Sequence, residues 1–139
     1  MNKQRGFSLI EIMVVVVILG ILASIVVPKI ISRPDEARVV KAKQDVLSIQ
    51  NALDLYKLDN GVYPSTDQGL MALVEKPTSN PVPRDWKPYL KSLPKDPWGR
   101  EYLYLNPGQH GDIDVFTLGA EGQPGGTGIN AEIGNWDAK

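Results

Sequence analysis

The stretch that decides the fold is RGFSLIEIMVVVVILGILASIVVPKI, residues 5–30. Residues 7–27 are apolar except for two serines, one glycine and a single acid, Glu11. A helix over these residues would be about 30 Å long, which matches the hydrocarbon thickness of a bilayer. The sequence therefore predicts a transmembrane helix over residues 7–27. A carboxylate inside such a helix is costly unless it is neutralised or paired, so Glu11 needs an explanation.

A short charged segment precedes the apolar run. Residues 1–6, MNKQRG, contain Lys3 and Arg5, and basic residues ahead of an apolar stretch are typical of an export signal. A cleaved secretory signal and a plain membrane anchor are two alternatives for residues 1–27. The first lacks a good small-residue cleavage site after the apolar run, and neither gives Glu11 a role.

The segment KQRGFSLIEIMVVVVILGILASIVVP closely resembles the N-terminus of type IV pilin-like proteins. In that family a prepilin peptidase cuts after the glycine, here between Gly6 and Phe7, and methylates the new amino group of Phe7. The resemblance implies that residues 1–6 are a cleaved leader and that Pro28 kinks the helix. It also implies that Glu11 pairs with the Phe7 amine of a neighbouring copy during assembly.

Cleavage would change the charges at this end of the chain. The formal charge is -1, so loss of Lys3 and Arg5 would take it to -3, while a cationic α-amine appears at Phe7. A contact between this amine and Glu11 of the next copy is head-to-tail. Such a contact repeats along a helical filament.

The residues after the apolar segment predict an amphipathic continuation of the helix. Apolar side chains recur every three or four residues from Val39 to Tyr56, and Gly61 suits the helix end. One long rod from Phe7 to Leu58 follows if the two prolines within it only kink its path.

The second half of the chain predicts three further elements. A short helix is expected from about residue 66 to 75, with Thr66 or Asp67 as its cap. The proline-rich residues 76–99 exclude regular helix, and Trp86, Tyr89 and Trp98 are expected to pin this stretch to the core. Residues 100–105, REYLYL, and 112–118, DIDVFTL, predict an antiparallel hairpin.

Composition excludes several kinds of chemistry. The chain of 139 residues has no cysteine, one histidine and a net charge of -1. Disulfides and thiol chemistry are therefore excluded, and no broad basic surface indicates nucleic acid as a partner. His110 lies in the turn NPGQHG, and no nucleophile with a matching base is evident, so the sequence predicts that the protein is not an enzyme.

Three further segments, YPSTDQGLMAL (residues 63–73), DPWGREY (96–102) and IGNWD (133–137), resemble the major pseudopilins of type II secretion systems. The resemblance covers almost the whole chain. It implies an α+β, type IV pilin-like fold in which the long N-terminal helix packs on a small antiparallel sheet. Residues 28–139 would form a periplasmic globular domain that includes the amphipathic half of the helix.

The same resemblance implies a structural role. The chain would sit in the bacterial inner membrane as a single-pass protein among lipid, be processed by the prepilin peptidase, and polymerise into a periplasmic pseudopilus. Its partners would be further copies of itself, minor pseudopilins and the inner-membrane assembly platform, and the filament would help drive folded proteins across the outer membrane. A type IV pilin or a minor pseudopilin is the alternative within the family. A membrane-anchored periplasmic enzyme or binding protein is the alternative outside it.

Two sets of charged or flexible residues remain. Asp45 and Asp54, with Arg38 and Lys41, are candidates for pairs between subunits, although charges on a helix more often form only a solvated face. The glycine-rich residues 118–132 have no periodicity, so they need a tether to be ordered.

The resemblance implies that a calcium ion supplies that tether. The implied ligands are the backbone carbonyls of Leu118 and Gln123 and the side chains of Glu121 and Glu132. Calcium takes about six to eight oxygen ligands from carboxylates, carbonyls and water. This chain departs from the family at both acids, where aspartate is usual, and the extra methylene of glutamate changes the reach. The alternative is a solvated loop, or one held by Ile133 and Trp136 alone.

Overall fold

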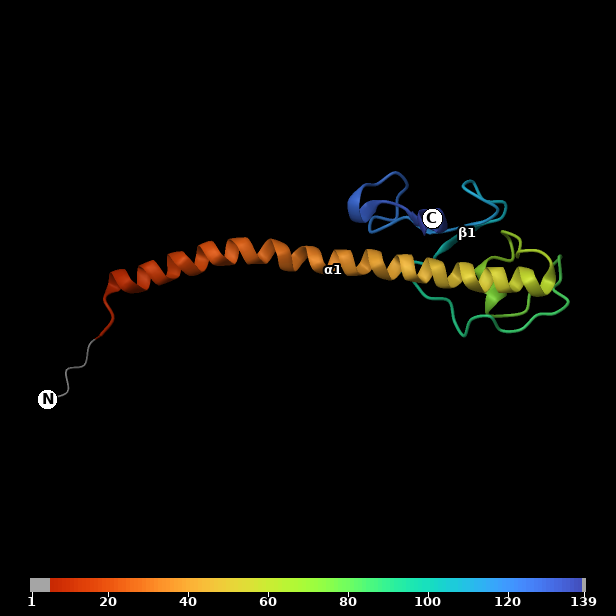
Figure 1. Ribbon diagram of the computed structural model, residues 1–139, viewed down its shortest axis with the longest axis horizontal. Coiled ribbons are helices and arrows are strands. Elements are labelled where there is room, and N and C mark those ends of the chain that lie inside the picture. Colours follow the sequence, from red (N-terminus) through yellow and green to blue (C-terminus); the bar gives the residue numbers. More distant parts are fainter. Residues whose placement is uncertain (1–5, 139) are drawn as a thin grey trace. The chain divides into compact units, whose positions relative to one another are not determined.

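The computed structural model describes the backbone of residues 6–138 and the side chains of residues 6–24 and 34–137. The chain divides into two compact units, Met1–Glu36 and Ala37–Lys139. One helix, α1 (Leu9–Asn60), contributes its N-terminal half to the first unit and its C-terminal half to the second (Figure 1). Each unit is considered by itself.

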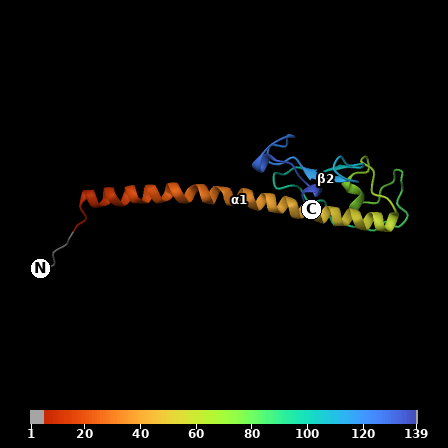
Figure 2. The same cartoon turned by 45° about the horizontal axis from the view of Figure 1, so that its top comes forward.

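In the first unit, α1 begins with a reciprocal pair of hydrogen bonds. The backbone N–H of Ser8 donates to Glu11 Oε2 at 3.2 Å, and the N–H of Glu11 donates to Ser8 Oγ at 3.3 Å. This arrangement is a capping box, which satisfies two N–H groups that a helix start would otherwise leave unpaired. The apolar side chains that follow are exposed, such as Leu9 and Val16. Figure 2 shows this half of α1, in red and orange, as a continuous helical ribbon.

The predicted transmembrane segment, residues 7–27, is described only in part. Its last positions and Pro28 fall among residues 25–33, whose side chains lie outside the described set, so the predicted kink at Pro28 does too. Within what is described, no helix combines the length and the apolar character needed to cross a membrane. The membrane span over residues 7–27 stays a prediction.

The second half of α1 forms the centre of the second unit. Its buried residues recur every three or four positions, as predicted for the amphipathic stripe: Ala42, Val46, Ile49, Ala52, Leu53 and Tyr56. The helix ends at Asn60, and Gly61 follows with φ 82° and donates its N–H to the Lys57 carbonyl at 2.7 Å. The predicted stop at Gly61 is confirmed, since glycine tolerates this left-handed conformation.

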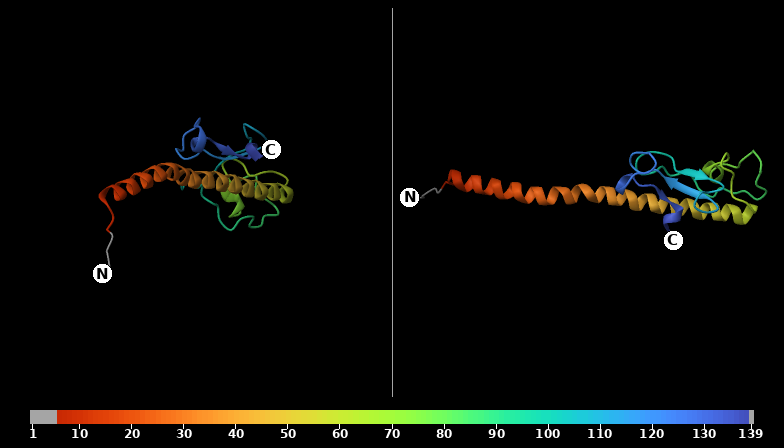
Figure 3. Two further views of the ribbon diagram at one scale, coloured as in Figure 1. Left: turned by 60° about the vertical axis from the view of Figure 1, so that its left-hand side comes forward. Right: turned by 90° about the horizontal axis from the view of Figure 1, so that it is seen from above.

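A three-stranded antiparallel sheet packs on this half of α1, in the order β1-β2-β3 (Figure 3). The strands are β1 (Leu103–Leu105), β2 (Asp114–Thr117) and β3 (Ile133–Gly134). Leu103 pairs with Phe116, and Phe116 pairs with Gly134 on its other side. The predicted hairpin is confirmed. The sequence did not indicate β3, because two residues carry no alternation of apolar and polar side chains.

The helix predicted over residues 66–75 is wrong in both extent and cap. The structure has a short 3₁₀-helix, η1 (Leu70–Leu73), which follows Gly69 at φ 65° and has no side-chain cap. Thr66 instead bonds to the far end of β1, since its hydroxyl donates to the Asn106 carbonyl at 3.0 Å and accepts from the Asn106 N–H at 2.9 Å. The long-range pair displaces the local cap.

The proline-rich segment is pinned to the core by two of the three aromatic residues expected to do so. Trp86 Nε1 donates to the Ala72 carbonyl at 2.7 Å, and Tyr89 Oη donates to Asp59 Oδ2 at 2.8 Å. Both rings pack against the buried core cluster, whereas Trp98 is half-buried outside it. In Figure 1 this segment, drawn in green, passes on the opposite side of the second half of α1 from the blue C-terminal segment.

Candidate functional site

The bond predicted to be cut is accessible within the first unit. Gly6 and Phe7 precede α1 and have no regular secondary structure, and Phe7 is 86% exposed. A peptidase must hold its substrate backbone extended, so a bond outside the helix suits cleavage. Residues 1–5 of the predicted leader lie outside the described residues.

Glu11 has a partner within its own chain that the sequence argument missed. The pattern Ser8-Leu9-Ile10-Glu11 is a capping-box sequence, and the structure forms that box. Ser8 is uncharged, so the contact orients the carboxylate without neutralising it. A single copy therefore uses Glu11 to cap its own helix.

The acids considered for contacts between subunits also have partners inside the second unit. Lys41 Nζ lies 2.6 Å from Asp45 Oδ2, and Tyr102 Oη donates to the same oxygen at 2.8 Å. Tyr63 Oη donates to Asp54 Oδ1 at 2.8 Å, and burial together with this hydrogen bond raises the pKa of Tyr63 to about 12. The structure thus pairs Lys41 with Asp45 within one chain.

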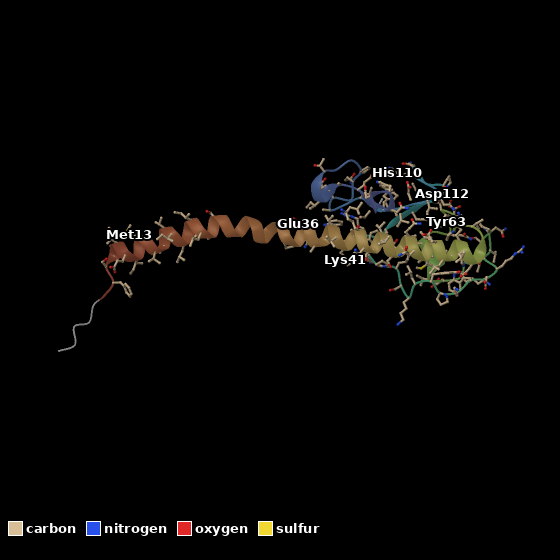
Figure 4. All side chains as sticks on the ribbon, in the orientation of Figure 1. Met13, Glu36, Lys41, Tyr63, His110 and Asp112 are labelled. Atoms are coloured by element: carbon tan, nitrogen blue, oxygen red, sulfur yellow. The ribbon has the colours of Figure 1, made fainter. Side chains whose placement is uncertain are left out.

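His110 lies in the predicted turn but makes contacts that the sequence did not reveal. Its ring stacks on Trp136 with centroids 3.7 Å apart, and its Nδ1 lies 3.0 Å from Asp114 Oδ2. Figure 4 shows Tyr63, His110 and Asp112 on the same side of α1, where a groove of about 480 Å³ opens. The stack on Trp136 and the contact with Asp114 give His110 a packing role.

The C-terminal loop, residues 118–132, connects β2 to β3 and is turned by glycines. Four of them have positive φ: Gly119 (84°), Gly122 (67°), Gly125 (82°) and Gly128 (60°). A backbone hydrogen bond crosses the loop from the Ala120 N–H to the Ile129 carbonyl at 2.9 Å, and the Gly122 N–H closes a local turn on the Gly119 carbonyl at 3.2 Å. Seven of its fifteen residues are exposed, and Gly119 is the buried one.

All four predicted calcium ligands lie in this loop. Glu121 and Gln123 are exposed, and Leu118 and Glu132 are half-buried. Over the part of the chain whose side chains are described, no group of three or more acidic, histidine or cysteine side chains could hold a metal ion. The predicted ligands are two carboxylates and two backbone carbonyls, and calcium prefers oxygen donors of these kinds.

A protein cation already occupies part of this loop. Arg100 Nη1 donates to the carbonyls of Gly119 and Ala120, both at 3.1 Å. These two carbonyl oxygens thus converge on a positive charge of the protein itself. Sequence reasoning missed Arg100, because it is 19 residues away from Gly119 along the chain.

Two sequence families match this chain. Residues 29–136 match the family described as type II secretion system (T2SS), protein G, and residues 1–27 match the prokaryotic N-terminal methylation motif. Together they cover nearly the whole sequence. The second match includes Gly6, Phe7 and Glu11.

Relatives and a solved structure agree with these matches. A type II secretion system core protein G of Vibrio cholerae is 62% identical over 139 residues, covering 99% of this chain and 94% of the relative. That of Pseudomonas aeruginosa is 61% identical, covering 98% and 97%. A crystal structure of the major pseudopilin from the type 2 secretion system of enterohaemorrhagic Escherichia coli is 46% identical, with a TM-score of 0.67 over 77% of this chain and 93% of that one.

Proposed function

This chain belongs to the type II secretion system protein G family, and from that premise we propose how its two ends act. It is a major pseudopilin, a structural subunit of the pseudopilus, and family membership confirms the prediction that it is not an enzyme. Its partners belong to the secretion machinery, and the methylation motif implies processing by a peptidase.

The first step is removal of residues 1–6 by the prepilin peptidase, with methylation of the Phe7 amine. The motif match over residues 1–27 and the exposed backbone at Gly6 and Phe7 support this step. Because the cut lies ahead of the apolar helix, only the charged head is lost. The apolar residues stay in the mature chain.

We propose that those apolar residues hold the chain in the inner membrane before assembly, with residues 28–139 in the periplasm. The exposed side chains on the first half of α1, such as Leu9, Val16 and Leu22, support this location, because lipid would cover them. Subunits then polymerise on an inner-membrane platform with minor pseudopilins. The growing filament helps drive folded proteins across the outer membrane.

The assembly contact joins Glu11 of an incoming subunit to the Phe7 amine of one already in the filament. Glu11 is hydrogen-bonded only to neutral groups of Ser8 in the described structure, so its charge is available for a cation. The Phe7 amine exists only after cleavage. Processing therefore creates the second half of the pair, which keeps unprocessed chains out of the filament.

Two matched variants separate the charge of Glu11 from its capping role. Glu11→Gln keeps a capping-box residue but removes the charge, whereas Ser8→Ala removes the cap hydrogen bond and keeps the charge. We expect Glu11→Gln to abolish pseudopilus formation, measured by cross-linking of subunits in cells. Ser8→Ala costs about 1 kcal/mol of helix stability and should leave assembly close to wild type. Wild-type assembly of Glu11→Gln, or equal loss in both variants, would contradict the charge pair.

We also propose that calcium binds the C-terminal loop through the side chains of Glu121 and Glu132 and the carbonyls of Leu118 and Gln123. The all-oxygen donor set supports this proposal. When bound, the ion would cross-link the two ends of the loop. Glu121 and Glu132 would supply the negative charge, and the positive-φ glycines would let the backbone turn its carbonyls inward.

A further inference from the structure

Arg100 joins two parts of the second unit that are far apart in sequence. It lies in the turn before β1, and its guanidinium reaches the start of the C-terminal loop. Nη1 donates to the carbonyls of Gly119 and Ala120 at 3.1 Å each. Hydrogen bonds from a charged donor are roughly twice as strong as neutral ones.

Arg100 and the loop are both anchored by one buried carboxylate. Asp96, 4% exposed, accepts the backbone N–H of Arg100 on Oδ1 at 2.8 Å and the Thr117 hydroxyl on Oδ2 at 2.6 Å. Thr117 is the last residue of β2, and its hydroxyl oxygen accepts the Gly119 N–H at 3.3 Å. Asp96 thus holds the backbone of Arg100 close to the end of β2, where the loop begins, independently of the guanidinium contacts.

The loop backbone also passes unusually close to the guanidinium. A Cβ atom added at Gly122 would lie 2.6 Å from both Cζ and Nε of Arg100. A side chain at this position would make the flexible Arg100 guanidinium shift, and the φ of 67° at Gly122 separately favours glycine there. The loop therefore wraps around the Arg100 head from residue 119 to residue 122.

We propose that Arg100 is an internal cation that closes the C-terminal loop in the absence of a metal ion. Its guanidinium draws the carbonyls of Gly119 and Ala120 together and packs under Gly122. A positive charge at this place also opposes a second cation, so Arg100 lowers the affinity of the loop for calcium. That second consequence rests on the proposed calcium site, whereas closure of the loop by Arg100 does not.

Hydrogen exchange at two amides reports loop closure directly. The N–H groups of Ala120 and Gly122 donate to loop carbonyls, so they exchange slowly only while the loop is closed. The mature full-length chain in detergent micelles is compared as wild type, Arg100→Gln and Arg100→Lys, each with chelator and with calcium. Lys95→Gln is the matched control, because Lys95 is an exposed cation near Arg100. Its backbone forms an isolated β-bridge with Glu101, the residue that follows Arg100.

With chelator present, we expect the amide hydrogens of Ala120 and Gly122 to exchange at least about tenfold faster in Arg100→Gln than in wild type. The exchange rates of the β2 amides should be unchanged. Lys95→Gln should match wild type. Calcium should then restore protection in Arg100→Gln, with tighter calcium binding by calorimetry than in wild type. Wild-type exchange in Arg100→Gln would overturn the proposal.

Two other outcomes separate this proposal from the calcium site. If Arg100→Gln loosens the loop and calcium restores nothing in any variant, Arg100 closes the loop and the calcium site is wrong. If Arg100→Gln also speeds exchange of the core amides of α1, the variant has lost overall stability. Arg100→Lys then tests the role of the charge, because it keeps a cation at this position. Protection of Ala120 in Arg100→Lys must then exceed that in Arg100→Gln, and equal loss would overturn the role of Arg100.

Discussion

Asp114 is a buried carboxylate at the start of β2 that organises the turn before it. It is 1% exposed, and its oxygens accept the backbone N–H groups of Gln109 at 2.8 Å and of His110 at 3.2 Å. Burial raises the pKa of Asp114, but hydrogen bonds from His110 and the backbone outweigh burial, so the pKa lies below its usual value. The charged form is therefore the one that the fold stabilises.

Replacing Asp114 by asparagine should destabilise the fold and change its response to acid. The amide presents an NH₂ group to N–H donors, so Asp114→Asn should cost about 2 kcal/mol at neutral pH. Because the folded pKa is depressed, the carboxylate stabilises the wild type above the unfolded pKa, and this contribution is lost as pH falls through the folded pKa. Urea unfolding at pH 7 and at acidic pH measures both effects.

Asp112→Asn is the control for this measurement, since Asp112 is an exposed carboxylate two residues away. It should change the free energy of unfolding by less than about 0.5 kcal/mol. If Asp114→Asn lost stability in acid as steeply as the wild type, the assignment of this pH dependence to Asp114 would be wrong.

Single residues were predictable from sequence only where the local sequence itself marked them as unusual. Glu11 was predicted because a charge inside an apolar run has few explanations, but its partner Ser8 was missed although it is only three residues away. Arg100 was not found, because its partners begin at Gly119 and nothing in DPWGREY marks a loop contact. A guanidinium on a turn ordinarily points into solvent, and only the folded path of the loop brings carbonyls to it.

The C-terminal end of α1 is set by the conformation of one glycine, Gly61. Gly61 has φ 82°, and a Cβ atom added there would meet nothing within 4 Å. Gly61→Ala should therefore cost about 1 kcal/mol through backbone strain alone. Gly61→Asn should cost less, because asparagine tolerates this conformation better. Chemical denaturation of the two variants measures the difference.

Gly111 provides the control for Gly61. A Cβ atom at Gly111 also meets open space, and its φ lies outside the left-handed region. Gly111→Ala should be nearly neutral in the same denaturation experiment. Equal costs at the two glycines would show that the conformation of Gly61 does not determine the helix end.

Elements differed in how far sequence could predict them. The long periodic helix and the hairpin were predicted, since their patterns extend over many residues. The short helix after residue 66 was not, because Gly69 interrupts it and Thr66 bonds to Asn106 rather than to its own backbone. Strand β3 depends on pairing with β2, where Phe116 meets Gly134, and no local signal marks that contact.

For the whole molecule, calcium should raise the thermal stability of the mature chain. A ligand that binds only the folded state stabilises it by about 2.7 kcal/mol at a hundredfold excess over Kd. Thermal unfolding with calcium and with chelator measures this shift. Glu132→Gln should reduce the calcium-dependent shift and leave the melting temperature in chelator nearly unchanged. Identical melting temperatures of the wild type in both conditions would exclude the calcium site.

We propose that a peptidase turns an inert precursor into an assembly-competent subunit by cutting between Gly6 and Phe7. Co-expression of the full chain with a prepilin peptidase, followed by mass spectrometry of the intact product, tests it most directly. The account predicts a chain that lacks residues 1–6 and carries one added methyl group on Phe7. A chain that keeps residues 1–6, or that is cut elsewhere, would contradict it.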